Sequence, residues 1–185
     1  VRFTKRSNNG LRKMCYRLNV TNPQTASKPK GNTNRKAVNK KNTQMTVYDT
    51  NKVVRDVRGA IRYDENGKPH LSNDSKHISI THAHKVAAAA MSEKYIVGID
   101  VEVQRQQLFK ISDKFLHPEE KMRIRPDRVL EDLHVYWGAK EALFKIWKYG
   151  EVDFSHEFRV APFAAKDSGE TTATILKGGL EIHCN

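Results

Sequence analysis

The chain has 185 residues, which is enough for one domain or two small lobes with a packed core. Hydrophobic residues make up 38% of the sequence, less than the roughly 45–50% of typical globular chains, so part of the chain is expected not to pack. No apolar run approaches the roughly 20 residues that span a bilayer, which argues against a membrane protein. The two cysteines, Cys15 and Cys184, provide neither a disulfide framework nor metal-ligand spacing, so we expect a reducing compartment, the cytoplasm.

The net charge of +12 is concentrated at the amino terminus. Residues 1–44 contain twelve Lys and Arg and no acidic residue, whereas residues 45–185 hold 21 of each charge. This basic leader is rich in Asn, Thr and Pro and poor in apolar residues. We therefore predict that residues 1–44 are disordered or loosely packed, above all residues 19–44. An organelle transit peptide has a similar composition and is the alternative. Binding of nucleic acid is disfavoured, because no aromatic residues or binding motif accompany the charge.

From residue 45 onward, the sequence predicts a packed domain. Residues 63–71 (YDENGKPHL) have the composition of a turn between two extended segments. Residues 77–82, 85–92 and 95–102 are predicted to be strands that form a small antiparallel meander. Alanine favours helices, so the middle run is ambiguous, and its position between two strands decides for a strand.

Helices are predicted in the centre of the domain. Residues 111–124 indicate one or two short helices, with Ser112 as a cap and Pro118 opening the second. Apolar residues at helical spacing predict a long helix at about 128–149, which ends at Gly150.

Strands are predicted again at the end of the chain, over residues 156–163, 171–177 and 179–184. Gly178 and Gly179 indicate a hairpin between the last two. Strands, a long helix and further strands together predict an α+β domain.

Two carboxylates stand at the end of the third predicted strand, in the sequence GIDVE of residues 98–102. Asp100 and Glu102 lie two positions apart, so their side chains share a face and repel each other unless a cation lies between them. Glu141 and Lys145 share a face of the long helix, and Glu141 could complete a three-carboxylate site suited to Mg²⁺. The alternatives are a strand that ends in solvent and an ordinary surface Glu–Lys pair.

These motifs together resemble the signature of 4′-phosphopantetheinyl transferases. GIDVE at residues 98–102 is followed about forty residues later by WGAKEALFK at residues 137–145. The residues that match are Gly98, Asp100, Glu102, Trp137, Lys140, Glu141 and Lys145. Residues 67–69 (GKP) and 79–82 (SITH) resemble two further elements in the right order, and Glu120 resembles the acid of a fifth.

The Trp-x-x-Lys-Glu helix is similar to that of the surfactin-synthetase-type branch of the family. The resemblance implies small antiparallel sheets, each packed against a long helix, in a pseudo-dimer of two lobes. We accordingly expect a partial, truncated amino-terminal lobe at residues 45–97 and a carboxy-terminal lobe with the metal motif at residues 98–185. A monomer is expected, with a homo-oligomer as the alternative if the first lobe is incomplete.

The resemblance also implies an activity. It is the transfer of 4′-phosphopantetheine from coenzyme A to a serine of an apo acyl or peptidyl carrier protein, which is the holo-acyl-carrier-protein synthase reaction of fatty acid biosynthesis. The implied metal is Mg²⁺, or alternatively Mn²⁺, held by Asp100, Glu102 and Glu141. The implied catalytic residues are Glu141, Lys145 and Asp100. The implied coenzyme-binding residues are Lys68, Thr81, His82, Lys140 and Lys145.

Three other readings of the sequence stay open or are set aside. His82 and His84 form a His-x-His pair, but zinc is disfavoured because no further ligands follow at the right spacing. The acidic motifs also match Mg²⁺-dependent nucleases loosely, and a truncated first lobe would suit a non-catalytic module that binds carrier proteins.

For the acidic carrier, residues 110–128 offer a docking surface of apolar and basic side chains.

Overall fold

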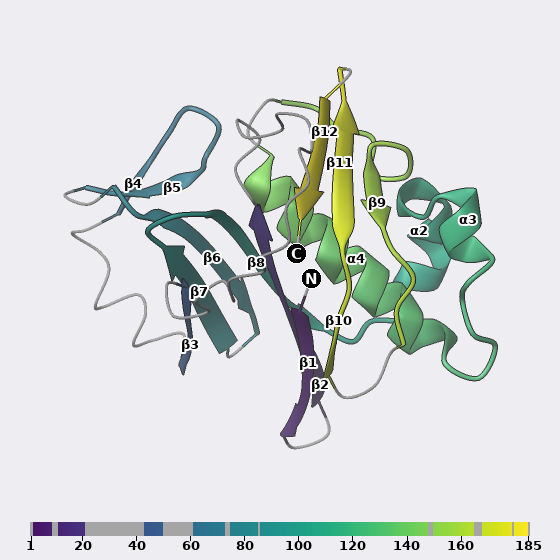
Figure 1. Ribbon diagram of the computed structural model, residues 1–185. Helices are drawn as coiled ribbons and strands as arrows, with labels where there is room; N and C mark the ends of the chain where they lie inside the picture. The colour runs from purple at the N-terminus through teal and green to yellow at the C-terminus, as the bar shows by residue number, and fades with distance from the viewer. Residues whose placement is uncertain are drawn as a thin grey trace, which may run out of the picture.

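The computed structural model describes residues 2–8, 11–20, 43–49, 61–72, 75–84, 86–147, 150–164, 168–178 and 180–184. They form two antiparallel sheets, a separate hairpin and three helices, which is an α+β fold (Figure 1). None of the described helices combines the length and the apolar character needed to cross a membrane.

The larger sheet has seven strands and is antiparallel. Its path is β10 (Ser168–Glu170), β1 (Arg2–Asn8), β2 (Leu11–Val20), β12 (Leu180–Cys184), β11 (Ala173–Lys177) and β9 (Phe158–Val160), and β8 (Ile96–Val103) also pairs with β2. The smaller sheet has the order β3 (Thr43–Asp49), β7 (Val86–Ser92) and β6 (His77–Ala83).

The separate hairpin consists of β4 (Ile61–Tyr63) and β5 (Pro69–Leu71). Its turn is held by Asp64, whose Oδ1 accepts the backbone N–H groups of Asn66 and Lys68 at 3.0 and 2.9 Å. Gly67 has a φ of +75°, a conformation that costs a residue without Cβ little. The predicted turn within residues 63–71 is confirmed.

The three helices are α2 (Leu108–Phe115), α3 (Pro118–Lys121) and α4 (Val129–Ile146). Figure 1 shows α4 against the strands of the larger sheet, with α2 and α3 at the side of β9. The main core lies between α4 and this sheet and is centred on Phe115, Tyr136, Leu143, Phe158 and Ile175. A long helix packed on the larger sheet was predicted. No such helix for the smaller sheet lies among the described residues, so that half of the expectation stays a prediction.

β8 lies between two packing environments. A second buried cluster joins Val97, Ile99 and Val101 of β8 to alanines of the smaller sheet, Ala83, Ala88 and Ala90. Because side chains alternate along a strand, the even-numbered residues of β8 face the other way, towards α4. The strand is therefore buried on both faces, and its two carboxylates point at the helix.

The predicted strands at 77–82, 85–92 and 95–102 are confirmed as β6, β7 and β8. Within the predicted meander, the pairing of β6 with β7 is confirmed. The pairing of β7 with β8 is wrong, because β8 pairs with β2 instead. The strands predicted over 156–163, 171–177 and 179–184 are confirmed as β9, β11 and β12, and β10 was not predicted.

The two predicted short helices are confirmed as α2 and α3. Pro118 occupies the first turn of α3, which a capping box of His117 and Glu120 begins. Ser112 does not cap a helix, since it lies inside α2 and its hydroxyl donates to the carbonyl of Phe109 at 3.2 Å. The long helix ends at Ile146, before Gly150.

The basic leader contributes two strands to the larger sheet. β2 pairs with β8 over eight successive residue pairs, from Lys13 opposite Val103 to Val20 opposite Ile96. The prediction of loose packing is therefore wrong for β1 and β2. Composition was misleading because a strand can be held through its backbone groups, whatever its apolar content. The rest of that prediction, over residues 21–42, lies outside the described residues.

The predicted boundary between the two lobes falls between residues 97 and 98, inside β8. The division into lobes at 45–97 and 98–185, and the truncation of the first, stay predictions.

Candidate active site at the crossing of β8 and α4

The site begins with a glycine that lets a helix cross a strand at close range. A Cβ atom on Gly98 would lie 2.1 Å from the carbonyl oxygen of Ala142 and 2.9 Å from a side-chain carbon of Ile146. Only glycine fits such an approach, because the nearest atom belongs to the helix backbone. The crossing brings the next even-numbered residues of β8, Asp100 and Glu102, opposite residues 137–145 of α4.

Asp100 is the most deeply buried carboxylate of the site, with 5% of its surface exposed. Its Oδ1 accepts two hydrogen bonds, from Lys145 Nζ at 2.7 Å and from Thr81 Oγ1 at 3.1 Å. Its Oδ2 is also buried and has no hydrogen-bond partner among the described residues. One oxygen is therefore held by two donors while the other is bare, an arrangement that costs free energy in a protein interior.

Glu102 lies beside Asp100 on the same face of β8. Its Oε1 accepts the indole N–H of Trp137 at 3.3 Å, and its Oε2 lies 3.8 Å from the guanidinium of Arg105. Burial raises the pKa of Glu102, and the charge of Asp100 raises it further. The two carboxylates thus repel each other, as their spacing in the sequence suggested.

Glu141 reaches the same place from α4. Burial raises the pKa of its carboxyl to about 7, and the charge of Asp100 adds to the rise while Lys145 opposes it. Glu102 contributes a smaller increase. The three carboxylates therefore interact electrostatically across the crossing, and a proton on Glu141 relieves part of their repulsion near neutral pH.

No three His, Cys, Asp or Glu side chains in the described ranges form a ready-made group for a metal ion. Instead, the ammonium of Lys145 is the cation next to Asp100. The donor set still fits a hard divalent cation, because Asp100 Oδ2 is buried without a partner and burial and repulsion raise the pKa values of Glu102 and Glu141. That Asp100, Glu102 and Glu141 bind metal stays a prediction.

A cleft of about 570 Å³ opens beside this crossing. It is lined by Lys68 from the hairpin, by His82 from β6 and by Lys145 from α4. These are three of the five residues that the sequence associated with coenzyme binding. Because Lys145 also binds Asp100, the cleft and the carboxylates share one side chain.

The remaining wall of the cleft is largely apolar. It includes Tyr63, Phe144, Trp147 and the isoleucines Ile78 and Ile80. Tyr63 and Phe144 are 67% and 44% exposed, although large apolar side chains are usually buried. The lining thus combines basic side chains with apolar surface and one acidic residue, Glu151, and this mixture suits an anionic ligand with an organic body.

Thr81 and Lys140, the other two expected coenzyme residues, do not line this cleft. Thr81 is buried and its hydroxyl points at β8, where it donates to Asp100 and accepts the N–H of Val101 at 3.3 Å. The SITH motif predicted that Thr81 lies next to His82 on one strand. Neighbouring residues of a strand face opposite sides, so when His82 faces the cleft, Thr81 faces away from it.

Lys140 is fully buried, with 0% of its side chain exposed. Its Nζ donates to Glu120 Oε2 and to the carbonyl of Phe115, both at 2.6 Å, and to the carbonyl of Phe154 at 2.9 Å. All three of its protons are used, so it has none to offer a phosphate. The expectation that Lys140 binds coenzyme is therefore wrong in this structure.

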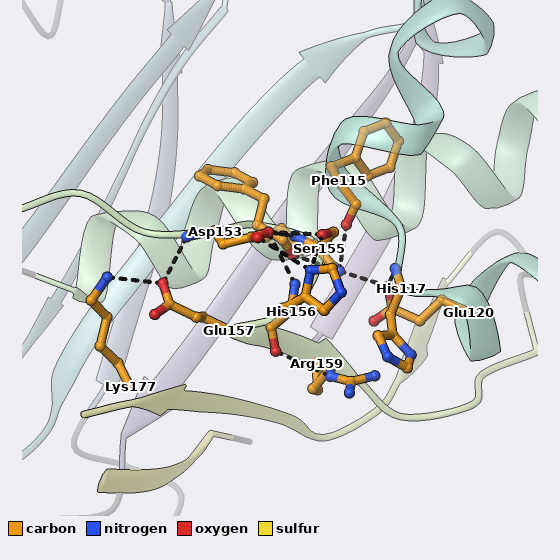
Figure 2. Close-up of polar contacts among 11 residues, drawn as sticks. Phe115, His117, Glu120, Asp153, Ser155, His156, Glu157, Arg159 and Lys177 are labelled. Carbon is orange, nitrogen blue, oxygen red and sulfur yellow. Dashed lines mark hydrogen bonds and ion pairs between the residues drawn. The ribbon is translucent and has the colours of Figure 1, made fainter. Parts of the chain in front are cut away.

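The partners of Lys140 belong to a polar network behind α4. Glu120 also accepts the N–H groups of His117 and Val160, at 2.9 and 2.8 Å, so both of its oxygens are used. Figure 2 shows this carboxylate near a turn in which Asp153 accepts hydrogen bonds from Ser155 and His156. These bonds lower the pKa of Asp153 to about 2, the hydroxyl of Ser155 being the largest cause. The network fastens α3 and the segment before β9 to α4.

The docking surface expected at residues 110–128 is only partly exposed. Phe115 and Leu116 are buried in the core, whereas Met122 is 79% exposed. Most of its cations face acids, in the pairs Lys121–Asp113, Arg123–Glu119, Arg125–Asp132 and Arg128–Glu131. Carrier binding here stays a prediction, and it now rests on fewer groups.

Sequence reasoning assigned no role to Trp137, and it gave Thr81 a different one. Trp137 was recognised only as a motif residue, and the structure shows its indole on Glu102 and its ring stacked on Phe154. A Trp one helical turn before Glu141 could have suggested a contact near the carboxylates, but no sequence signal showed that the hydroxyl of Thr81 faces Asp100.

Comparison with known proteins agrees with the motifs. Residues 96–185 match the model of the family described as the 4′-phosphopantetheinyl transferase superfamily. The match includes β8, α4 and the carboxylates at their crossing. No curated protein matches the chain. By this match, the part of the chain from residue 96 to residue 185 belongs to the 4′-phosphopantetheinyl transferase superfamily.

Proposed function

We propose that this protein transfers the 4′-phosphopantetheine arm of coenzyme A to a serine hydroxyl of an apo acyl or peptidyl carrier protein, with Mg²⁺ or Mn²⁺ as the metal ion. One observation carries the proposal. Lys145 lines the cleft together with Lys68 and His82, and it binds Asp100 Oδ1 at 2.7 Å. A single side chain therefore links the basic residues suited to coenzyme phosphates with the carboxylates suited to a metal.

The proposed metal ligands are Asp100, Glu102 and Glu141. The bare oxygen of Asp100 and the raised pKa of Glu141 support this set, because a divalent cation would compensate both. When bound there, the metal would offset negative charge on the pyrophosphate of the coenzyme.

In the proposed reaction, the oxygen of the carrier serine attacks the phosphorus that bears the pantetheine arm. The bond from this phosphorus to the bridging oxygen breaks, and 3′,5′-adenosine bisphosphate leaves with the bonding electrons. Glu141, whose buried carboxyl interacts with Asp100 across the crossing, accepts the serine proton. Lys145 compensates charge on the pyrophosphate, while Lys68 and His82 hold the 3′-phosphate end of the ligand.

The finer expectations extend this proposal. They are membership of the surfactin-synthetase-type branch, a monomeric state, a cytoplasmic location and a role in fatty acid biosynthesis. The presence of Trp137 and Glu141 in one helix motif supports the branch, and the other three stay predictions from the sequence.

The test is incubation of the full chain with coenzyme A, Mg²⁺ and an apo carrier protein, followed by mass spectrometry of the carrier. We expect a gain of one phosphopantetheine group, which EDTA abolishes. Asp100→Asn should remove the activity, and Glu93→Gln, which neutralises an exposed carboxylate in the turn before β8, is the control. Binding of the carrier without modification would point to a non-catalytic module, and nicking of plasmid DNA to a nuclease.

A further inference from the structure

We propose that Thr81 is a positioning residue for Asp100: its hydroxyl holds one carboxylate oxygen in place, so that the other is presented to the metal. The inference rests on the proposed function, because it assumes that Asp100 binds a divalent cation. It gives Thr81 a task other than contact with the coenzyme.

The first step is that the backbone of β8 fixes the direction of the Thr81 hydroxyl. A hydroxyl has one proton to donate. The N–H of Val101 can only donate, so it occupies an acceptor site of Thr81 Oγ1, at 3.3 Å. The single proton of the hydroxyl then points to Asp100 Oδ1, at 3.1 Å. The β-branched side chain has few rotamers, which keeps this geometry in place.

The second step concerns the difference between the two donors to Asp100. Lys145 is long, 25% exposed and lines the cleft, so its ammonium can turn to a phosphate when the ligand binds. Thr81 is short and only 6% exposed, and it cannot leave. When Lys145 binds phosphate, Thr81 is the donor that still holds Oδ1, and the free Oδ2 keeps its orientation.

The third step is a comparison with Ser79, two residues earlier on β6. Its hydroxyl accepts the N–H of Ile99 at 3.1 Å, just as Thr81 accepts that of Val101. Both hydroxyls thus fasten β6 to the edge of β8 that faces away from β2. Of these two hydroxyls, that of Thr81 also donates to a carboxylate, Asp100 Oδ1. Ser79 is therefore a natural control for the structural part of the role.

The experiment measures Mn²⁺ binding to the metal-free full chain, without coenzyme or carrier, by electron paramagnetic resonance of free Mn²⁺. Thr81→Val removes the hydroxyl at nearly constant volume and should weaken Mn²⁺ binding about tenfold, as the loss of an outer-shell partner typically does. Thr81→Ser should restore most of the affinity. Ser79→Ala should lower the melting temperature about as much as Thr81→Val, because each leaves a backbone N–H of β8 unsatisfied, but should bind Mn²⁺ like the wild type.

The outcomes separate this inference from the proposed function. If the wild type binds Mn²⁺ and Thr81→Val binds it equally well, the positioning role is refuted while the transferase proposal stands. Equal losses of affinity in Thr81→Val and Ser79→Ala would also refute it, since the effect would then be structural. If the wild type binds no Mn²⁺, or if Asp100→Asn binds it like the wild type, the metal site itself is wrong and the proposed function loses its metal.

Discussion

Helix α4 contributes a lysine to each of two ion pairs, whose N–O distances are similar but whose surroundings differ. Lys140 lies 2.6 Å from Glu120, and Lys145 lies 2.7 Å from Asp100. The side chains of the first pair are 0% and 2% exposed, and those of the second are 25% and 7% exposed. In the first pair each oxygen and each proton has a partner, whereas in the second one oxygen of Asp100 has none.

This difference separates a structural ion pair from the pair that we propose to be functional. The attraction within a buried ion pair offsets the free-energy cost of desolvation only when further hydrogen bonds satisfy both groups, which is the case for Lys140 and Glu120. The pair at Lys145 lacks this completion and opens on a cleft, so it is poised to exchange partners with a ligand. We infer that α4 holds the fold together on one side and carries the chemistry on the other.

The largest effect is expected from breaking the structural pair. Lys140→Met leaves the charge of Glu120 buried without its partner and should lower the free energy of unfolding by about 3–5 kcal/mol. Urea denaturation measures this loss. Lys145→Met, the matched change in the other pair, should cost less, about 1.5–3 kcal/mol, because Thr81 still donates to Asp100, but it should abolish transfer activity. Equal losses of stability in the two variants would contradict the distinction.

The second prediction concerns the close approach of α4 to β8 at Gly98. Gly98→Ala places a methyl group against the carbonyl of Ala142 and should cost about 3 kcal/mol, because the obstructing atom is backbone. It should also separate Lys145 from Asp100 and so remove activity in any molecules that still fold. Gly150→Ala is the control, since nothing lies within 4 Å of the added carbon and only its φ of +81° opposes it. That strain should cost about 1 kcal/mol. Thermal unfolding of both variants measures the difference.

The third prediction uses the titration of Glu141 in the metal-free protein. Its pKa is raised from 4.5 in the unfolded chain to about 7 in the fold, chiefly by burial. The folded state therefore binds the proton more tightly. The stability that this proton provides is complete below pH 4.5 and is lost as the pH rises to about 7. We expect a decrease of about 2 kcal/mol over this window, after allowance for partial exposure.

The control for this titration is Glu141→Gln, which should show a smaller dependence on pH between 4.5 and 7. Unfolding by urea at several pH values, in the presence of a chelator, makes the comparison. A stability curve that is the same in both proteins would show that the fold does not raise the pKa of Glu141.

Much of this site follows from the sequence, and the part that does not has a physical reason. The period-two and period-3.6 patterns predicted β6, β7, β8 and α4 because each buries a continuous face. The basic leader was misjudged, because the pairing of β2 with β8 depends on backbone groups far away in sequence. Lys140 was misjudged for a related reason. A motif gives the position of a lysine, but only packing decides whether its ammonium meets a carbonyl or a ligand.

The fourth prediction tests Trp137, which holds the second carboxylate. Trp137→Phe removes the indole N–H that binds Glu102 Oε1 but keeps an aromatic ring against Phe115 and Phe154. The expected loss of stability is about 1 kcal/mol, as for a single hydrogen bond, and Mn²⁺ affinity should fall a few-fold. Trp147→Phe, on the cleft wall just after the end of α4, is the control and should leave Mn²⁺ affinity unchanged. Electron paramagnetic resonance and thermal unfolding measure both variants.

The smallest effect concerns the carrier protein, and here two arginines repeat the contrast between the two lysines. Arg125 donates to buried Asp132 at 2.6 and 3.0 Å, so it belongs to the structure and its reversal would damage the fold. Arg123 pairs with exposed Glu119 at 3.8 Å, hydrogen-bonds the phenol of Tyr136 and lies next to exposed Met122. Arg123→Glu should therefore cost about 1 kcal/mol in stability, as for a single hydrogen bond, raise the KM for an acidic carrier about three- to fivefold, equivalent to roughly 1 kcal/mol, and weaken its salt dependence. Lys94→Glu makes the same change of charge at the turn before β8 and should leave this KM unaltered. Steady-state kinetics at two salt concentrations decide the matter, and an unchanged KM in Arg123→Glu would place the carrier on another surface.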